Sequence, residues 1–416
     1  MLAPTIPECP EYMSETTADT STREQEKPVR TTREQMLGDP RALVVPDGTD
    51  VIEEAQYQGK DYERVFVPRS VLKIQAFAFD GCKDLREVVF EEGSRLRTIG
   101  KNAFRNCRSL AEIAFPDGLE RIGMYAFQGT GFQRLEFPGS LRVLSQGTFQ
   151  GCKSLRRAEF REGLETLGTD EYPEGGMYWH GVFADSGLES VALPSTLRRI
   201  EYSAFQACMR LKSVSLPAGV SRIGKQCFYL SALEQITLPP ALRVIEKNAF
   251  RECKLRSIRL PEGLEEIGLQ AFFGCGFEDV ELPASLRVLT QGAFTKCACL
   301  RTVKFNAGLE VLGTDEYLAN GGTHYGVFQE SGVERVELPS TLRRIEYNTF
   351  KNCDDLQSIA LPDSVEYIGK MCFLGSGLLR VRLPRRGVRA EANAFDGSSA
   401  KNGVVFRDGM VFQKDV

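Results

Sequence analysis

The sequence predicts a β-rich solenoid, a stack of short parallel strands in one elongated domain. Three observations predict it: phenylalanine returns about every 22 residues, a short alternating apolar pattern follows each one, and a proline ends most of these patterns. With a fixed period of this length, each unit buries its apolar face only against its neighbours. The period is marked by Phe79, Phe104, Phe127, Phe149, Phe183, Phe205, Phe228, Phe250, Phe272, Phe294, Phe328, Phe350, Phe373 and Phe395.

The chain begins with a segment that lacks the repeat. Residues 1–38 contain SETTADTSTREQEKPVRTTREQ and almost no apolar side chains. Such a segment cannot bury enough surface to offset the entropy lost on ordering, so we expect a disordered tail. The tail either has no role or is a regulatory segment phosphorylated on its Ser and Thr residues.

The solenoid is predicted to cover residues 39–400. Tyr57 stands 22 residues before Phe79 and takes the phenylalanine position in a degenerate N-terminal cap, because terminal repeats are usually atypical. The pattern is lost after Phe395, and residues 401–416 are predicted to form a C-terminal cap.

Residues 242–263 illustrate one unit, LRVIEKNAFRECKLRSIRLPEG. Leu255, Ile258 and Leu260 have the spacing of a short strand whose alternate residues face inward. Pro261 then ends the strand, because it has no N–H to donate, and Gly263 permits the turn.

The other part of the unit is predicted to form the opposite wall. Leu242 and Ile245 would pack this wall from the inside. The segment EKNAF is expected to be a helical or 3-10 turn that directs Phe250 into the interior. Helical or 3-10 turns are therefore predicted to lie opposite the strands.

The third residue after the repeat phenylalanine is cysteine in eight units and Ser or Thr in six others. A position shared by these residue types requires a small, weakly polar side chain at a tight inward turn. We expect reduced structural thiols, with disulfides between neighbouring rungs as the alternative; Cys297 and Cys299 are too close to chelate zinc alone. The eight are Cys82, Cys107, Cys152, Cys208, Cys253, Cys275, Cys297 and Cys353.

The combined pattern resembles the BspA-like leucine-rich repeat family, whose units read roughly LxxIxxxAFxxCxxLxxIxIPxx(V/L). Matching stretches are KNAFRNCRSLAEIAFPDGLERIG, SAFQACMRLKSVSLPAGVSRIG and NTFKNCDDLQSIALPDSVEYIG. The resemblance covers about residues 40–400 and implies a right-handed leucine-rich-repeat stack with a parallel sheet along one face. It also implies adhesion or protein–protein contact, often at cell surfaces.

Two steps of 34 residues interrupt the period, from Phe149 to Phe183 and from Phe294 to Phe328. They lie 145 residues apart, and residues 163–202 align with residues 308–347 at the same offset. The sequence therefore indicates that a block of six rungs was duplicated as a unit.

Each block carries one 12-residue insertion, TDEYPEGGMYWH at 169–180 and TDEYLANGGTHY at 314–325. The insertions hold both histidines and the single tryptophan of the chain, and insertions in a repeat project from one face where binding often occurs. Solvated surface loops are one interpretation, partner contact through aromatic side chains is a second, and metal ligation is a third with a poor ligand spacing. The candidate partner-binding residues are Asp170, Glu171, Tyr172, Tyr178, Trp179, His180, Asp315, Glu316, Tyr317, His324 and Tyr325.

Composition disfavours several classes of function. The formal net charge is −4, and the outward strand positions are five small, four acidic and three basic residues, so the basic stripe needed for nucleic acid is missing. No phosphate loop, nucleophile elbow or zinc-protease motif occurs, and two histidines make acid–base catalysis by histidine improbable. We expect no enzyme activity, no cofactor and no metal.

The N-terminal residues show no secretory signal pattern, and no apolar run is long enough to span a membrane. We therefore expect a cytoplasmic protein, with the cell surface as the alternative. The predicted function is a non-enzymatic protein-interaction scaffold that uses the solenoid face and the two inserted loops, and the alternative is a surface adhesin or structural protein. The partner and the oligomeric state stay open.

Overall fold

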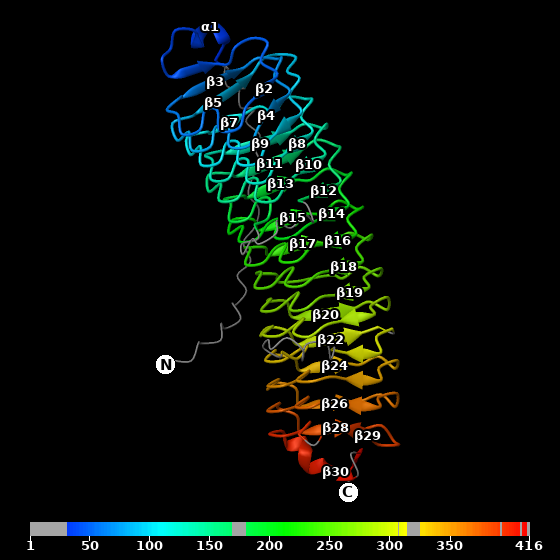
Figure 1. Cartoon of the computed structure of the whole chain (residues 1–416). Coiled ribbons are helices and arrows are strands. Elements are labelled where there is room, and N and C mark those ends of the chain that lie inside the picture. The colour runs from blue at the N-terminus through cyan, green and yellow to red at the C-terminus, as the bar shows by residue number, and fades with distance from the viewer. Residues whose placement is uncertain are drawn as a thin grey trace, which may run out of the picture.

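The computed structural model describes residues 31–168, 180–306, 308–313, 325–391, 393–407 and 410–413. The chain forms an elongated, gently curved rod with its N-terminal rungs at one end and its C-terminal rungs at the other (Figure 1). Most rungs contribute two short strands, which pair in parallel with the equivalent strands of neighbouring rungs. The predicted β-rich solenoid of parallel strands is confirmed.

The first ladder contains the strands that precede the prolines. Its central strands alternate buried and exposed residues, as in β9, where Leu135 and Phe137 are buried and Arg134 and Glu136 are exposed. It is divided into short sheets made of β1 (Ala42–Val44), β3 (Arg64–Val67), β5 (Glu87–Phe90) and β7 (Glu112–Ile113); β9 (Arg134–Phe137), β11 (Arg157–Phe160) and β13 (Ser190–Ala192); β15 (Ser213–Ser215) and β17 (Gln235–Thr237); β20 (Asp279–Leu282), β22 (Thr302–Phe305) and β24 (Arg335–Glu337); and β26 (Ser358–Ala360) and β28 (Arg380–Arg382).

The second ladder contains two-residue strands whose second residue faces the core. The sequence predicted that Leu242 and Ile245 pack the wall opposite the strand; both are buried, and Ile245 lies in strand β18 of this second ladder. Eleven strands form one sheet: β2 (Val51–Ile52), β4 (Lys73–Ile74), β6 (Thr98–Ile99), β8 (Arg121–Ile122), β10 (Val143–Leu144), β12 (Thr166–Leu167), β14 (Arg199–Ile200), β16 (Arg222–Ile223), β18 (Val244–Ile245), β19 (Glu266–Ile267) and β21 (Val288–Leu289). A further sheet holds β23 (Val311–Leu312), β25 (Arg344–Ile345), β27 (Tyr367–Ile368), β29 (Val388–Ala390), β30 (Val404–Arg407) and β31 (Met410–Gln413).

One rung departs from the predicted strand pattern. Leu255 and Leu260 are buried as expected, but no strand forms between them. A backbone hydrogen bond of 3.3 Å from Arg256 N–H to the Glu234 carbonyl still joins this rung to the preceding one. The apolar spacing therefore predicted burial correctly here but not the strand.

The third wall, which carries the repeat phenylalanines, consists of hydrogen-bonded turns, and the predicted helical or 3-10 turns are not confirmed there. Eighteen non-glycine residues have φ between 53° and 61°, all two positions before or after the repeat aromatic residue. Helices require negative φ at every residue. In most rungs the N–H groups at these positions, and that of the phenylalanine, donate to the next rung, as from Phe79 to the Ala103 carbonyl at 2.7 Å.

The repeat phenylalanines form one continuous stack inside the rod. All fourteen are fully buried, and each ring lies 5.0–5.8 Å from the next with interplanar angles of 1–13°. Tyr57 continues the stack beyond Phe79 at 5.3 Å. The stack is unbroken at both 34-residue steps, so the insertions leave the core in register. Offset stacked pairs contribute about 0.5–1.5 kcal/mol each beyond the burial of their area.

The cysteine position has a hydrogen-bonding role as well as a small volume. All eight cysteines at this position are free and buried. The thiol of the eight cysteines donates to the repeat aromatic carbonyl of the preceding rung at 2.9–3.2 Å, as from Cys107 to Phe79. Hydroxyls at the same position, such as those of Ser331 and Ser376, donate to the phenylalanine carbonyl of their own rung.

The two ends of the rod carry different elements. Residues 31–38 were assigned to the disordered tail, but they contain helix α1 (Arg33–Met36), which begins with a capping box between Thr32 and Gln35 and buries Met36. The tail prediction is thus wrong for these residues, because one buried methionine and a helix cap suffice to anchor them. Residues 1–30 lie outside the described residues. The C-terminal end has the 3-10 helix η2 (Ser399–Gly403), after which β31 pairs antiparallel with both β29 and β30.

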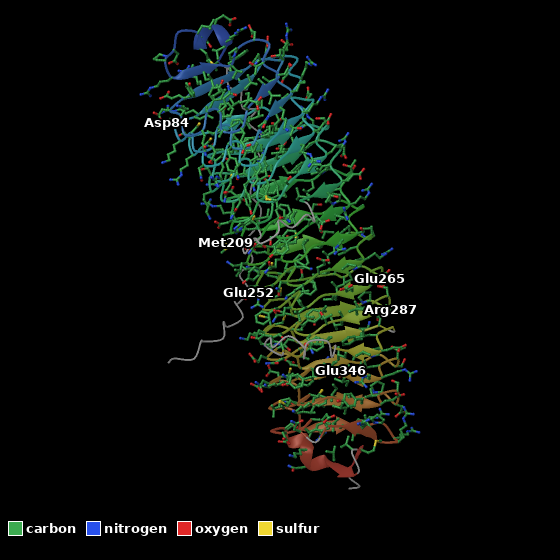
Figure 2. The ribbon with its side chains drawn as sticks, in the orientation of Figure 1. Asp84, Met209, Glu252, Glu265, Arg287 and Glu346 are labelled. Carbon is green, nitrogen blue, oxygen red and sulfur yellow. The ribbon has the colours of Figure 1, made fainter. Side chains whose placement is uncertain are left out.

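Side chains project from two opposite edges of the rod. Figure 2 shows Asp84, Met209 and Glu252, which follow repeat phenylalanines, along one edge. Glu265 and Arg287, which precede strands of the second ladder, lie along the other edge. The inserted loops leave the rod next to the second ladder, after Leu167 and Leu312.

Candidate functional site: the roots of the two inserted loops

The structure places only two of the predicted partner-binding residues, His180 and Tyr325, the last residues of the two insertions. They are equivalent in the duplication, at the offset of 145 residues. The other predicted residues lie outside the described residues, and their role stays a prediction: Asp170, Glu171, Tyr172, Tyr178, Trp179, Asp315, Glu316, Tyr317 and His324.

His180 packs against the rung that lies two turns earlier. Its ring meets the Tyr125 ring edge-on, with 6.4 Å between centroids and an interplanar angle of 71°. Gly147, in the intervening rung, makes this contact possible, since a Cβ atom there would lie 2.2 Å from the Tyr125 ring. Partial burial lowers the pKa of His180 below its ordinary value of 6.5.

Tyr325 occupies the same place in the second block. Its ring meets Phe273 edge-on at 5.6 Å, and the Arg251 guanidinium lies 4.1 Å from the centroid of the same Phe273 ring. Gly292 again lies beneath the contact. A Cβ atom built on this glycine would lie 3.3 Å from the Tyr325 Cβ atom. Both loops therefore return to the rod through an aromatic contact beside a glycine, although the partners differ, since Tyr125 aligns with Gln270 and not with Phe273.

The two ends of each insertion meet at the rod. A Cβ built on Gly168, the residue before the first insertion, would lie 3.8 Å from a methyl group of Val182, just after it. Gly313 and Val327 have the same spacing in the second block. The described residues that flank each insertion therefore lie close together on the rod.

A buried carboxylate lies at each loop root, and sequence reasoning missed it. The side chains of Glu201 and Glu346 are 5% and 4% exposed, and each is paired with an arginine two residues earlier in the chain. The Arg199 Nε atom lies 3.4 Å from Glu201 Oε1, and the Arg344 Nε atom lies 2.7 Å from Glu346 Oε1. Removing one partner of such a pair leaves an uncompensated buried charge. The signal in the sequence that could have indicated this carboxylate is the motif RRIEY, which follows both insertions.

The surface around the loop roots is suited to contact with a partner and offers few groups for catalysis or metal binding. A shallow depression of about 320 Å³ lies between β21, β23 and β25, with Arg344 and Glu346 in its wall. Among the residues that the structure describes, no group of three or more His, Cys, Asp or Glu side chains could hold a metal ion. Within the same part of the chain, no helix has the length and apolar character needed to cross a bilayer.

The first ladder presents the outward residues that the sequence identified. Ten of the twelve are exposed, and Ala114 and Glu159 are half-buried. Opposite charges face each other where they occur, as between Lys304 and Glu281 at 2.9 Å. This face carries both signs of charge along most of its length, in agreement with the sequence.

The comparisons with known proteins concern the fold. The chain is similar to a leucine-rich repeat protein from Bacteroides ovatus, with 24% identity, 88% of this chain and 86% of the other covered, and a TM-score of 0.62. It is also similar to a leucine rich cell surface protein from Faecalibacterium prausnitzii, with 20% identity, 87% and 86% covered and a TM-score of 0.44. A leucine rich repeat protein of T. pallidum matches at 28% identity over 45% of this chain and 91% of its own length, with a TM-score of 0.36.

None of the curated proteins compared with the chain is similar enough to count as a relative. The family model described as the BspA type leucine rich repeat region matches residues 50–172, 180–239, 221–318 and 323–411, which together make up most of the rod. The chain therefore belongs to the BspA-type leucine-rich repeat family.

Proposed function

We propose that the protein is a non-enzymatic scaffold that binds protein partners through the solenoid face and the two inserted loops. The observation that carries the proposal is the equivalence of the loop roots, each formed by an aromatic contact across a glycine and a buried Glu–Arg pair. Six rungs at about 4.8 Å separate the roots by roughly 29 Å. Two equivalent contacts at a fixed separation favour a partner that is itself repetitive or dimeric, because the second contact then forms at a high effective concentration.

Support for contact through the loops comes from their side chains. Tyr and Trp dominate binding hot spots because they provide large contact areas with few rotatable bonds. The insertions hold Tyr172, Tyr178, Trp179, Tyr317 and Tyr325. Closed loop roots reduce the entropy lost when such residues are immobilised by a partner.

The test is deletion of residues 169–180 together with 314–325, followed by capture of partners from native extract. We expect the double deletion to lose partners that the intact chain retains, while each single deletion weakens capture without abolishing it. A control variant replaces both loops by Gly and Ser of equal length, which keeps the chain connectivity. Unchanged capture by the double deletion, with circular dichroism unchanged, would refute a binding role for the loops.

The second candidate function is a surface adhesin or surface structural protein, which family membership favours. Cell fractionation combined with thiol labelling distinguishes the two candidates. Reduced thiols in the soluble extract support the scaffold, and labelling of the chain on intact cells supports the adhesin.

A further inference from the structure

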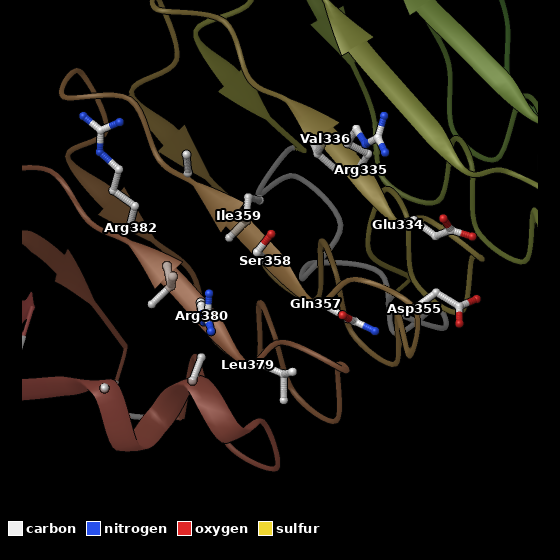
Figure 3. A pocket seen from close by; sticks show the side chains of 14 residues that line it. Glu334, Arg335, Val336, Asp355, Gln357, Ser358, Ile359, Leu379, Arg380 and Arg382 are labelled. Atoms are coloured by element: carbon white, nitrogen blue, oxygen red, sulfur yellow. The ribbon is translucent and has the colours of Figure 1, made fainter.

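The outer face of the first ladder is hollowed near its C-terminal end. A groove of about 1140 Å³ runs over β24, β26 and β28, and Ala400 and Gly403 of η2 lie at its far side. Figure 3 shows the three strands side by side with η2 beyond β28. The groove is open to solvent along its length, so it can accept an extended ligand.

The floor of the groove is made by small side chains. The outward residues of β26 are Ser358 and Ala360, both exposed. They pair in register with Arg380 and Arg382 of β28, while β24 carries Arg335 on the other side and Glu337 outside the groove lining. The surface over β26 is therefore recessed between β24 and β28, and the arginine side chains of these two strands border the groove.

The charge within the groove is unbalanced. Its two carboxylates, Glu334 and Asp355, are both bound by Arg301, at 3.4 Å and 2.9 Å. No ion pair reaches Arg335, Arg380 or Arg382 from any residue in the described ranges. Elsewhere on the rod arginines typically face a glutamate of their own or a neighbouring rung, as Arg243 faces Glu265. Three guanidinium groups are thus available to an anionic ligand.

An apolar contact lies beside the arginines. Leu379 is 56% exposed at the start of β28 and lines the same groove. A ligand that combines carboxylates with apolar side chains would use both kinds of surface. Guanidinium groups bind carboxylates through paired N–H donors, which adds geometric specificity to the attraction.

We infer that this groove binds an extended acidic peptide segment of a protein partner. The peptide backbone lies over Ser358 and Ala360, its carboxylates contact Arg335, Arg380 and Arg382, and an apolar residue packs on Leu379. The inference rests on the proposed function in that the partner is a protein, but it does not involve the inserted loops. Charge complementarity is the observation that selects this occupant.

The test measures fluorescence anisotropy of a labelled decapeptide of alternating Glu and Ala with the full-length chain, against the same peptide with Gln in place of Glu. We expect the Glu peptide alone to bind, with affinity that falls as salt is raised. The variant Arg335→Gln, Arg380→Gln, Arg382→Gln should bind it at least tenfold more weakly. Ser358→Trp, which fills the floor, should weaken binding without removing charge.

The matched control is Arg259→Gln, which removes an exposed outward arginine from the same face outside the groove and should change affinity by less than twofold. Equal binding of both peptides, or unchanged binding by the triple variant, would overturn the inference. Tighter binding of heparin or single-stranded DNA at the same arginines would overturn the assignment to a peptide. The loop-deleted chain should retain peptide binding, so failure of the loop proposal and failure of this inference are distinguishable.

Discussion

The thiol of Cys208 donates a hydrogen bond of 3.2 Å to the carbonyl oxygen of Phe183 in the preceding rung. The duplicated block repeats the contact between Cys353 and Phe328 at 3.0 Å. Burial raises the pKa of both thiols to about 12. Each thiol therefore stabilises the stack only while it is protonated, which makes the core sensitive to alkaline pH.

We predict that stability falls as the pH rises above about 9. The folded chain holds these thiol protons up to about pH 12, whereas an unfolded chain releases them near the ordinary pKa of 9.0, so unfolding is favoured as pH rises between the two values. At pH 10 each thiol lowers the free energy of unfolding by about 1.4 kcal/mol. Denaturant unfolding at pH 8, 9 and 10 with a reductant measures the decline. The variant Cys208→Ala, Cys353→Ala should show a decline smaller by about 3 kcal/mol at pH 10; an identical decline would contradict the assignment.

Leu230→Gly should stabilise the protein. Leu230 is held at φ 58° in the turn wall and its side chain is partly exposed. A left-handed conformation costs a residue with a Cβ atom roughly 1–2 kcal/mol, and glycine avoids that cost. Glycine also loses more conformational entropy on folding, which offsets part of this benefit. We therefore expect the free energy of unfolding, measured by thermal or urea unfolding, to rise by about 0.5–1 kcal/mol. Leu230→Ala is the control, since it keeps the Cβ; equal effects of the two changes would rule out relief of backbone strain.

Gly181→Ala should destabilise the rung that follows the first insertion. A Cβ at this position would lie 1.8 Å from the Ser203 carbonyl oxygen of the next rung, so the backbone must move. Gly326→Ala places a Cβ 1.7 Å from the Asn348 carbonyl oxygen, and the two variants should lose similar stability, about 2–3 kcal/mol. Hydrogen exchange should localise the loss to the rungs of Ser203 and Asn348. Gly276→Ala, whose Cβ would lie 3.4 Å from the nearest atom, should be tolerated; a comparable loss there would show that the effect is not steric.

His180 should titrate below pH 6.5. Its burial beside Tyr125 favours the neutral ring, so the stability that this contact contributes is present above the ordinary pKa and is lost as the pH falls through the lowered value. The histidine resonances in proton NMR spectra between pH 5 and 8 give the pKa, and His180→Tyr, which copies the second block, assigns the signal. That variant should also remove the acid-dependent part of the stability. A pKa at or above 6.5 would show that His180 is not held against the rod.

The main architecture could be predicted because its signals are periodic. The spacing of Phe127, Phe149 and Phe183 identified the stack and its interruptions, and the structure keeps all three rings in one column. The two-residue strands of the second ladder, such as Val244–Ile245, recur with the same period but are too short to show an alternating pattern, so no strand was predicted there. The positive φ angles were also hidden, because they occur at Leu, Gln, Glu and Asn as well as at glycine.

The candidate site was predicted only in part. The insertions and their endpoints His180 and Tyr325 followed from the duplicated sequence. The Glu201 and Glu346 carboxylates did not, since their burial depends on Gly168 and Gly313, which belong to a different rung. The shared use of Cys, Ser and Thr after the phenylalanine could have indicated a hydrogen-bond donor, because all three side chains carry one.

The hydrogen bonds of the turn wall run in one direction, since the N–H of every repeat phenylalanine from Phe79 to Phe373 donates to the next rung toward the C-terminus. Peptide dipoles that point the same way add, as they do in a helix, while those of ordinary strands largely cancel. The turn wall is therefore directional along the rod, since its N–H groups face the C-terminal end, whereas bonds beside the ladders, such as that from Gly100 N–H to the Ile74 carbonyl, face the N-terminal end.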